Sequence, residues 1–530
     1  MSRKSNIPVF KPYIQHQAKL LPQSYDELIE PGHLVRVVND TIEKLDLNVL
    51  EKQYKGGGAS SYHPKMLLKV LVYAYCKKIY TSRKIAAALR ENIHFMWLSG
   101  EQYPDFRTIN DFRGVRMKDL TETIFAEVLA YLVEAGYVKL EVYFADGTKI
   151  EADANKHKVV WAKRKETYQN RVKQQIEYLL DQIEQENEAE QTEYGEKDLE
   201  ERGGSGGGEL NAEQLEKKIA EINQKLNEQN RPKEETKAAR AALKKLSEDC
   251  LPRLEKYEEQ TETLDGRNSY SKTDPDASCM RMKEDRGAEK PWPKPAYNVQ
   301  MGTEGQFIVG YSVHNRAGDP TCLIPHLDQL RHNLGGRLPK KIVADAAYGS
   351  EENYAYLEKH QAENFLKYNT FYQDTHHYRD PDVLRAHQFR AENFGYDPDT
   401  DEFRCPADKR LHFQYTSRHT TANGYVTDRR NYTCQDCTDC PLKSKCTKAK
   451  GNRSIRISFQ LLAYRKQARA NLTSPEGERL RAARSTEVET VFGHVKHNLG
   501  FRRFHLRGLE KVNIEWGLVS IAHNMQKMAA

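Results

Sequence analysis

The stretch Val138–Ala154, VKLEVYFADGTKIEADA, alternates apolar and polar positions. This period of two predicts a strand whose apolar side chains are Val138, Leu140, Val142 and Phe144. The predicted strand ends on an acid, Asp146, and Gly147 follows it. A carboxylate at the end of an apolar strand is costly to bury without a partner. Asp146 is therefore either a turn residue that caps a hairpin or a metal-binding carboxylate, and the other acids of the chain decide between the two.

A helical periodicity runs through residues 1–130. It predicts a helix over Lys65–Tyr80 that Pro64 opens, a helix over Arg83–Glu91 that Ser82 caps, a further apolar segment at His94–Leu98 and a short helix over Phe106–Arg113. The last helix carries Arg107, Thr108, Asn110 and Arg113. Short helices in this succession are typical of a helix-turn-helix reader of DNA, and an ordinary helical bundle is the alternative.

From about Trp161 to Gln260 the background becomes highly charged, and apolar residues recur at helical and heptad spacing. They are Val172, Ile176, Leu179, Leu180 and Ile183, followed by Leu215, Ile219, Ile222 and Leu226. A flexible linker, Gly203–Gly208, separates the two runs, and Pro232 precedes another charged helix at Glu234–Tyr257. We expect a helical coiled-coil arm that serves as a solvated spacer or as a self-association surface.

The body resumes near Ser271, where the pattern predicts a mixed α/β sheet. Its elements are a hairpin of Tyr297–Gly302 and Phe307–Val313, a helix at Thr321–Leu334, a buried strand at Lys341–Ala344, a helix at Glu351–Lys359 and a strand at Asn364–Tyr368. The buried strand ends in Asp345. Sites in open sheets of this kind form at the carboxyl ends of strands. Trp292, between two prolines, is expected to pack against the body; stacking on an unpaired base is the alternative.

Region 370–475 is polar and breaks this pattern. It holds five of the nine cysteines: Cys405, Cys434, Cys437, Cys440 and Cys446; the isolated Cys76, Cys250, Cys279 and Cys322 are expected to be structural. Without a signal peptide, such clustering favours a metal over disulfides. Cys437-x2-Cys440 has zinc-knuckle spacing, and Cys446 and Cys405 can complete a Cys₄ site. Cys434 also forms a Cys-x2-Cys pair with Cys437, so five thiols compete for four places, and free thiols in a loop are the alternative.

A helical pattern returns over residues 476–499. Its apolar stripe is Val488, Val491, Phe492, Val495 and Leu499. Glu489 flanks the stripe, and Lys496 lies two turns further along the same edge. Leu509–Met528 predicts a final amphipathic helix with Val512, Trp516, Val519 and Ala522 inward.

Composition adds little to this picture. Charged residues make up 30% of the 530, the formal net charge is +6, and the mean hydropathy is −0.82. No run of 18 apolar residues occurs and the N-terminus MSRKSNIPVF has no hydrophobic region, which argues against membrane insertion and secretion and for the cytoplasm. Basic residues crowd into Arg479–Arg507, which is more informative than the net charge.

Three acids thus lie on distinct core elements: Asp146 and Asp345 end two strands, and Glu489 borders the apolar stripe of a late helix. Three converging carboxylates cannot all stay ionised without cations, and Mg²⁺ or Mn²⁺ takes carboxylate oxygens. Two such ions about 3.5–4 Å apart can hold the attacking and leaving oxygens of a phosphodiester exchange. Basic residues near Glu489 are suitable contacts for a phosphate backbone: Arg481, Arg484, Lys496, Arg502, Arg503 and Arg507.

Nine stretches carry a family resemblance: SYHPKMLLKVLVYAY (61–75), SRKIAAALREN (82–92), PDFRTINDFR (104–113), DGTKIEADANK (146–156), TDPDAS (273–278), YNVQ (297–300), ADAAYGSEENY (344–354), CPLKSKCTKAKGNR (440–453) and VETVFGHVKHNLGFRRFHLRG (488–508). Through them the chain resembles the DDE-type insertion-sequence transposases of bacteria, in the branch with a cysteine-rich segment before the final Glu. The resemblance covers nearly the whole chain outside the arm. It implies an RNase H-like catalytic domain, a triad of Asp146, Asp345 and Glu489 with two Mg²⁺ (or Mn²⁺) ions, and Cys405 rather than Cys434 in a structural zinc site.

In related transposases the Glu belongs to a motif Tyr-x2-Arg-x3-Glu-x6-Lys. Glu489 and Lys496 satisfy the Glu-x6-Lys part, and this spacing favours Glu489 over the neighbouring Glu487. The front of the motif departs from the family: Ser485 stands four residues before Glu489, Arg484 stands one step further back, and Ala482 occupies the Tyr position.

The resemblance implies an enzyme that cleaves DNA at the terminal inverted repeats of its element and joins the freed 3′-OH to target DNA. It implies a homodimer, since two ends are handled together, in a bacterial cytoplasm and on the nucleoid when bound. The expected DNA contacts are Arg107, Thr108, Asn110, Arg113, Arg484, Lys496, Arg502 and Arg503. The alternatives are a domesticated, non-catalytic zinc-containing DNA-binding protein and a general metal-dependent nuclease.

This prediction divides the chain into six parts. They are an N-terminal helical DNA-binding domain (1–130), the first part of the RNase H-like domain (131–160), the helical coiled-coil insertion (161–265), the second catalytic part (266–369), the cysteine-rich zinc insertion (370–475) and the C-terminal catalytic part with the Glu helix (476–530).

Overall fold

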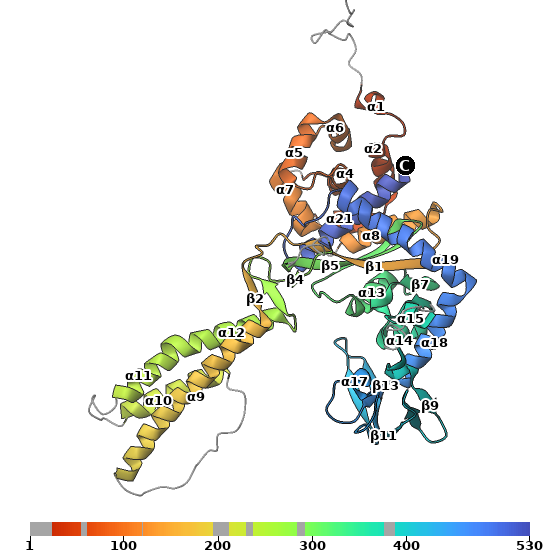
Figure 1. Ribbon diagram of the computed structural model, residues 1–530. Helices are drawn as coiled ribbons and strands as arrows, with labels where there is room; N and C mark the ends of the chain where they lie inside the picture. Colours follow the sequence, from red (N-terminus) through yellow and green to blue (C-terminus); the bar gives the residue numbers. More distant parts are fainter. Residues whose placement is uncertain are drawn as a thin grey trace, which may run out of the picture.

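The structure is a computed structural model of the chain, and it describes residues 24–52, 54, 61–118, 120–193, 211–228, 237–283, 292–375 and 387–530. These residues form a central sheet with flanking helices, a group of N-terminal helices, a long helical arm and a small β-rich insertion (Figure 1). Two predicted features, the Gly203–Gly208 linker and the break at Pro232, lie outside the described residues. Among the helices of the described part, none is long and apolar enough to span a membrane.

The central sheet has six strands and is mixed, as predicted. The strands are β1 (Val142–Glu151), β4 (Ser278–Met280), β5 (Lys294–Glu304), β6 (Phe307–His314), β7 (Lys341–Ala344) and β8 (Glu363–Leu366). Their order is β4–β5–β1–β7–β8, with β6 paired to β5. The predicted hairpin is confirmed as the antiparallel pair β5–β6, while β1, β7 and β8 pair in parallel.

The first strand differs from the prediction. It was expected to end at Asp146, but β1 continues to Glu151 and Asp146 lies in its middle. The reason is a change of partner along β1: β7 pairs with it only over Val142–Ala145, whereas β5 pairs with it as far as Glu151. Since Ala145 is paired with Ala344, both Asp146 and Asp345 directly follow the last parallel pair. The register alone therefore places these two acids side by side.

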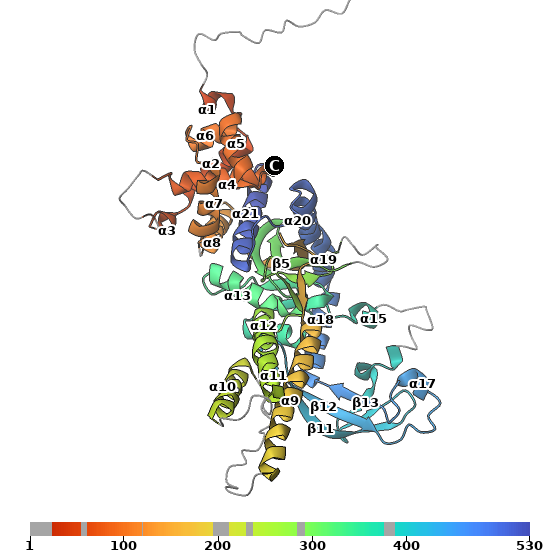
Figure 2. The same cartoon turned by 90° about the vertical axis from the view of Figure 1, so that its left-hand side faces the viewer.

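Helices cover both faces of the sheet. The final helix α21 (Leu509–Met528) matches the prediction, and its four predicted inward side chains are buried. In β6, Tyr311 contacts Phe125 of α8 (Thr121–Glu134), whereas the neighbouring Gly310 faces Leu330 of α13 (Leu323–Asn333). The two helices consequently lie on opposite faces of the sheet (Figure 2). The predicted helix Glu351–Lys359 is confirmed as α14, and α15 (Phe371–Thr375) and α18 (Phe459–Thr473) follow.

The N-terminal region is helical, as expected. Its helices are α1 (Tyr25–Leu28), α2 (Leu34–Lys44), α3 (Asn48–Glu51), α4 (Pro64–Cys76), α5 (Ser82–Glu91), α6 (Ile93–Ser99), α7 (Phe106–Asp111) and α8. Helix α7 continues as a π-helical turn, Phe112–Arg116. Thr81, rather than Ser82, caps α5 by accepting a hydrogen bond from the backbone N–H of Lys84. Helix α4 packs against α21, and the two regions share one hydrophobic core.

A helical arm leaves the body directly after β1. It consists of α9 (Ala162–Glu193), α10 (Ala212–Glu228), α11 (Lys237–Lys245), a π turn (Leu246–Cys250) and α12 (Leu251–Leu264). The predicted heptad positions Val172, Ile176 and Leu215 are among the buried residues of its own core. A small antiparallel pair, β2 (Val159–Trp161) and β3 (Ser269–Ser271), closes the base of the arm.

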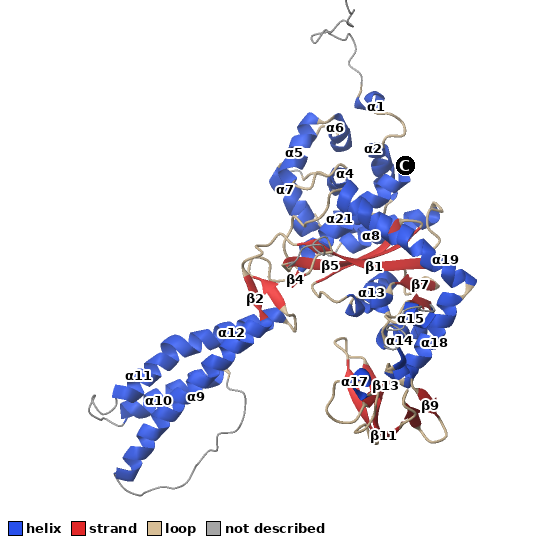
Figure 3. Cartoon of the chain, in the orientation of Figure 1, coloured by secondary structure: helices blue, strands red, loops and turns tan. Residues whose placement is uncertain are grey.

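The cysteine-rich region has more regular structure than its sequence predicts. It contains an antiparallel sheet in the order β13–β12–β11–β10–β9 and a short helix, α17 (Lys443–Cys446) (Figure 3). The strands are β9 (Gly395–Asp397), β10 (Glu402–Arg404), β11 (Arg410–Thr420), β12 (Val426–Cys434) and β13 (Ser454–Ile457). Strand β11 is exposed at most of its positions, so its sequence lacks the apolar alternation that marks a half-buried strand.

Candidate active site

Three acids from distant parts of the chain converge on one side chain, Arg484. Its Nη2 atom lies 2.9 Å from Asp146 Oδ2 and 3.9 Å from Asp345 Oδ2, and its Nη1 atom lies 4.0 Å from Glu489 Oε1. These are the three acids that the sequence predicts to act together. They arrive from the middle of β1, the end of β7 and a late helix.

Backbone N–H groups orient the two aspartates. Asp146 Oδ1 accepts a hydrogen bond from Gly147 N at 2.8 Å, and Asp345 Oδ1 accepts one from Ala347 N at 2.8 Å. The second bond caps the short 3₁₀ turn Ala346–Tyr348 that begins right after β7. One oxygen of each carboxylate is held in this way, and the other oxygen points at Arg484.

The helix that carries Arg484 and Glu489 contains a π-helical turn between them. The predicted helix 476–499 is formed by α19 (Pro475–Arg484), a π turn (Ser485–Glu489), α20 (Thr490–Gly493) and a second π turn (His494–Asn498). A π turn contains one more residue than an α turn, because its hydrogen bonds run from i to i+5. Arg484 and Glu489 are five apart, and the π turn brings them onto one face. This explains how Arg484 reaches the acids although it stands one step outside the family spacing.

Glu489 and its neighbour Glu487 have different roles. The Glu489 side chain is 66% exposed and faces Arg484. Glu487 instead accepts a hydrogen bond at 2.7 Å from the backbone N–H of Gln306, in the turn between β5 and β6. The geometry therefore agrees with the choice of Glu489 from its spacing to Lys496.

A second cation, Lys283, faces the site, and the sequence analysis missed it. Its Nζ donates to the carbonyl oxygen of Gly147 at 3.1 Å, one residue after Asp146. Burial raises the pKa of the Asp146 carboxyl above its usual value, while Arg484 and Lys283 oppose that rise and Asp345 adds to it. Asp146 thus lies between two cations from different segments. Lys283 lies three residues after the end of β4, and no local sequence pattern distinguishes it.

A chain of buried side chains supports the floor of the site. Tyr348 donates to Gln300 Oε1 at 2.5 Å, and Gln300 donates to Asn298 Oδ1 at 3.0 Å. A Cβ atom at Gly147 would lie 2.3 Å from Gln300 Nε2 and 3.0 Å from the Tyr348 hydroxyl. The Gly after Asp146 is therefore required by close approach. Asn298 and Gln300 belong to the YNVQ stretch, which the sequence analysis matched without assigning it a role.

Comparison with known protein families bears on this geometry. A family described as "Transposase DDE domain" matches residues 404–529, and one described as "Transposase domain (DUF772)" matches residues 23–114. The two matches indicate a DDE-type insertion-sequence transposase. No curated protein and no solved structure matches the chain. The mixed sheet is consistent with the RNase H-like fold expected of such a transposase, and Glu489 lies within the first match.

DDE transposase domains generally use divalent metal ions, and the donors here are of the right chemistry. Asp146, Asp345 and Glu489 offer carboxylate oxygens, which such ions prefer. They already surround one cation, the Arg484 guanidinium, so the site accommodates positive charge. In the described part of the chain, however, no three His, Cys, Asp or Glu side chains stand together as a ready metal site. The carboxylates of the transposase would have to draw closer to share an ion.

Two basic residues that were expected to contact DNA are largely buried. Lys496 is 8% exposed, and its Nζ donates to the carbonyl oxygen of Lys149 at 3.3 Å. The Lys496 side chain therefore stabilises β1 and does not face outward, contrary to the prediction. Arg484 is turned toward the acids in this state. By contrast, Arg502 and Arg503 are exposed, and Arg503 forms an ion pair with Asp153 at 2.9 Å.

Of the four side chains predicted on the N-terminal helix, three face solvent at least in part. Arg107 and Asn110 are exposed and Thr108 is half-buried. Arg113 is only 3% exposed and donates to the Tyr80 carbonyl at 2.6 Å and to the Tyr75 hydroxyl at 3.1 Å. The prediction of a DNA contact at Arg113 is therefore wrong, because Arg113 lies in the π turn that follows α7 and points into the core.

Trp292 also differs from the expectation that it packs against the body. Its side chain is 66% exposed, just before β5. This large exposed aromatic beside the strand that pairs with β1 is accessible for the alternative role, stacking on an unpaired base.

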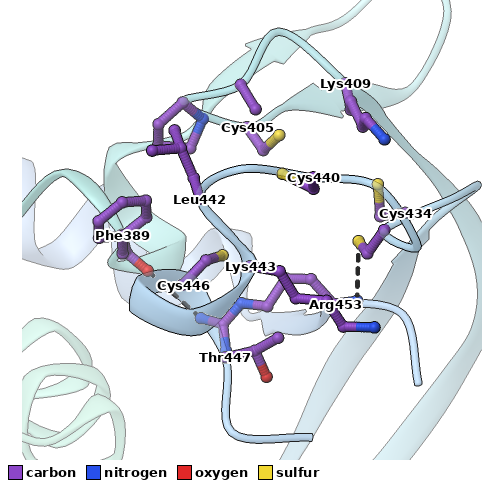
Figure 4. Close-up of a pocket in the computed structure, with 13 residues that line it drawn as sticks. Phe389, Cys405, Lys409, Cys434, Cys440, Leu442, Lys443, Cys446, Thr447 and Arg453 are labelled. Carbon is purple, nitrogen blue, oxygen red and sulfur yellow. Dashed lines mark hydrogen bonds between the residues drawn. The ribbon is translucent and has the colours of Figure 1, made fainter. Parts of the chain in front are cut away.

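The five clustered cysteines line one small cavity of about 20 Å³. That volume admits one water-sized particle. Figure 4 shows the thiols of Cys405, Cys434, Cys440 and Cys446 around this space. Cys437 accepts a hydrogen bond from Arg453 N at 3.4 Å, and Cys434 donates to the Asp436 carbonyl at 3.6 Å. Burial raises the pKa of Cys434 to about 11, and the nearby Cys437 adds to the rise. All nine cysteines are free thiols.

Proposed function

We propose that this transposase cleaves a phosphodiester bond at the terminal inverted repeats of its own element and joins the freed 3′-OH to target DNA. The observation that carries the proposal is the convergence of Asp146, Asp345 and Glu489 on a single cation. Carboxylates that converge on one point repel one another unless cations neutralise them, and such clusters of charged groups are typical of functional sites.

In the proposed reaction Asp146, Asp345 and Glu489 would hold two Mg²⁺ or Mn²⁺ ions. Bound there, such ions supply an activated oxygen nucleophile and stabilise the leaving oxygen. In Asp146 and Asp345 a backbone N–H holds one oxygen, so the oxygen that now faces Arg484 is the one that would bind an ion. Lys283, beside Gly147, is placed to neutralise a phosphate that approaches Asp146.

Recognition of the element's ends would fall to other surfaces. Arg107, Thr108 and Asn110 on the N-terminal helix are accessible and of the types that contact bases and phosphates. Arg502 and Arg503 are exposed close to β1, where they would contact the DNA backbone. We propose a homodimer, because a transposition reaction handles two ends together.

We also propose a structural Zn²⁺ held by Cys405, Cys437, Cys440 and Cys446. The support is the shared cavity and its volume. The thiols would have to draw closer to share an ion, because no three of them stand together as a ready metal site in the described part of the chain. The hydrogen bond from Cys434 to the Asp436 carbonyl favours leaving Cys434 out of the set. Elemental analysis tests the site: one zinc per chain, lost in Cys440→Ser and retained in Cys434→Ser, is expected. A folded protein without zinc would refute it.

The test of the catalytic proposal is a Mg²⁺-dependent nicking assay on duplexes with and without the element's ends. Asp146→Asn is expected to abolish nicking and to leave end binding intact. Nicking by Asp146→Asn at the wild-type rate would refute the metal-ligand role. The assay also separates the alternatives, since a general nuclease would cut without preference for the ends and a domesticated protein would bind without cutting.

A further inference from the structure

Arg484 occupies the centre of the acid cluster, where a positive charge is needed. Its side chain is only 11% exposed, and its two terminal nitrogens face all three acids. Within the described structure, no acceptor contacts its buried Nε. A buried N–H without a partner is unfavourable. Within the described part of the chain, the three acids are therefore the groups that hold the guanidinium, and a stronger cation can displace it from them.

We propose that Arg484 is an exchangeable internal cation. It neutralises the three acids while no metal is bound, and it leaves the cluster for a DNA phosphate when divalent ions enter. This inference rests on the proposed function, since it assumes that the same acids bind metal. The physical reason is that a guanidinium 2.9 Å from Asp146 and a divalent ion on the same oxygen would repel each other.

The π turn makes this exchange possible. It places Arg484 and Glu489 on one face of the helix, so that the guanidinium lies between Glu489, which is largely exposed, and the two aspartates. The side chain can therefore rotate toward the exposed side without unfolding the helix. Lys283 stays bonded to the Gly147 carbonyl on another segment, so a second positive charge remains near Asp146 during the exchange.

Two consequences separate this role from a simple DNA contact. First, the acids repel one another when Arg484 is absent and no metal is bound, so a neutral substitution destabilises the metal-free protein. Second, apparent metal affinity is reduced by the fraction of time that Arg484 fills the site, so its removal tightens binding. A residue that only contacts DNA would change neither property in the absence of DNA.

The experiment compares Arg484→Met with Arg479→Met, both without DNA. Arg479 is exposed on the same helix, so the control removes the same charge without touching the cluster. Mn²⁺ binding is followed by electron paramagnetic resonance, and melting temperature is measured in EDTA and in Mg²⁺. For Arg484→Met we expect about tenfold tighter Mn²⁺ binding, together with a lower melting temperature in EDTA that Mg²⁺ restores.

Equal Mn²⁺ affinity in Arg484→Met, Arg479→Met and wild type would overturn the exchange. Asp345→Asn distinguishes this failure from that of the proposed function. If Asp345→Asn binds Mn²⁺ as wild type does, the acids are not the metal site and both proposals fail. If Asp345→Asn loses Mn²⁺ while Arg484→Met is unchanged, only the exchange is refuted.

An independent observation concerns the distribution of charge. Residues 404–470 contain 15 Lys and Arg but only four Asp and no Glu, although the whole chain has an excess of just six positive charges. The remainder of the chain therefore carries more acidic than basic residues. Such segregation of positive charge is the mark of a surface that contacts a polyanion.

Part of this charge lies in a row on one face of the insertion's sheet. Arg456 and Tyr415 are both paired with Asn431, and Arg429 is two residues from Asn431, so their side chains share a face. Tyr415 is 58% exposed. On the same face, Thr427 donates to Glu351 at 2.8 Å, at the start of α14 and six residues after Asp345. The row therefore leads from the insertion to the neighbourhood of the acid cluster.

We infer that this row is a second contact surface for the backbone of duplex DNA bound at the acid cluster. The test measures the affinity of an element-end duplex in Ca²⁺ at 50–300 mM KCl (about the range in which phosphate contacts are salt-sensitive). Arg429→Gln combined with Arg456→Gln is expected to reduce the slope of log affinity against log salt concentration by about two. The reason is that each phosphate contact contributes about 0.9 to this slope. Arg418→Gln is the control, since Arg418 of β11 pairs with Asp428 on the opposite face of the same sheet.

A salt slope in the double variant equal to that of Arg418→Gln would overturn this surface. Wild-type protein with no affinity for the duplex at any salt would refute the proposed function as well. The two failures are therefore distinguished by the wild-type titration.

Discussion

The two neighbouring glutamates of the late helix provide a sharp test of how the site is built. Glu489→Ala removes the acid that faces Arg484, and Glu487→Ala removes the acid that holds the β5–β6 turn. Both variants lose one negative charge, within three residues of each other in one helix. We expect them to fail in opposite ways, the first in chemistry and the second in stability.

The magnitudes follow from exposure and contact distances. Glu489 is 66% exposed and its ion pair with Arg484 spans 4.0 Å, so its removal costs at most about 0.2–1 kcal/mol of stability. Glu487 accepts a 2.7 Å hydrogen bond from Gln306 N, and its loss costs about 1–2 kcal/mol. A metal ligand contributes several kcal/mol to the transition state, so Glu489→Ala should slow cleavage by about 100-fold or more.

The assays are denaturant unfolding and Mg²⁺-dependent nicking of an element-end duplex, with both variants at equal folded concentration. Glu489→Ala should unfold like wild type and fail to nick. Glu487→Ala should unfold at lower denaturant and nick normally while folded. If Glu489→Ala nicks at the wild-type rate, or folded Glu487→Ala does not nick, the assignment of the third acid is wrong.

Three further predictions concern the support of the site. Gly147→Ala should cost about 1–3 kcal/mol by overpacking, because its Cβ would lie 2.3 Å from Gln300 Nε2; thermal unfolding measures this, and an unchanged melting temperature would contradict it. Arg113→Met should destabilise by about 1.5–3 kcal/mol, because it removes a buried cation that donates hydrogen bonds to Tyr75 and Tyr80. It should not weaken DNA binding of the folded fraction; a denaturant series and an anisotropy titration check the two statements together. Burial lowers the pKa of His326 to about 3. The neutral imidazole therefore contributes fully to stability above its pKa in the unfolded chain, about 6.5, and this contribution is lost as pH falls toward 3. His326→Gln should flatten the dependence of unfolding free energy on pH between these limits, and an unchanged dependence would contradict it.

Much of the site was predictable because it rests on regular patterns. Lys341–Ala344 is a short apolar run that ends in an acid, and β7 has those bounds. The alternation before Asp146 identified a strand, but the end of that strand depends on which neighbour continues to pair with it. Strand β5 follows β1 to Glu151 after β7 has stopped, and no local signal in β1 reveals this.

Other features depend on tertiary packing, and local patterns are ambiguous about them. Arg113 and Lys496 are charged residues at positions that a regular helix would expose, yet both are buried. Each lies in a π turn, which shifts the following side chains relative to α-helical spacing. The same effect lets Arg484 reach Glu489 from a position that the family motif does not contain. Lys283 approaches Asp146 from a separate loop, so its role is visible only once the fold brings the two segments together.

In the cysteine-rich insertion, the clustering of the cysteines was predicted but the strands were not. Its cysteine spacing indicated one cluster, and the five cysteines do line one cavity. Its strands were missed because β11 is exposed on both faces over most of its length, so the sequence shows no apolar alternation there. A sheet stabilised by a small core around Phe403, Leu411 and Tyr432 needs few apolar positions.

The central claim is that Asp146, Asp345 and Glu489 form one divalent-metal site at the point of DNA cleavage. Anomalous scattering from Mn²⁺ in crystals of the transposase with an uncleaved element-end duplex tests it most directly. We predict Mn²⁺ density bounded by the three carboxylates, next to the scissile phosphate, with Arg484 turned out of the cluster. Density at another position, or no bound Mn²⁺ while Arg484 still lies among the acids, would contradict the account.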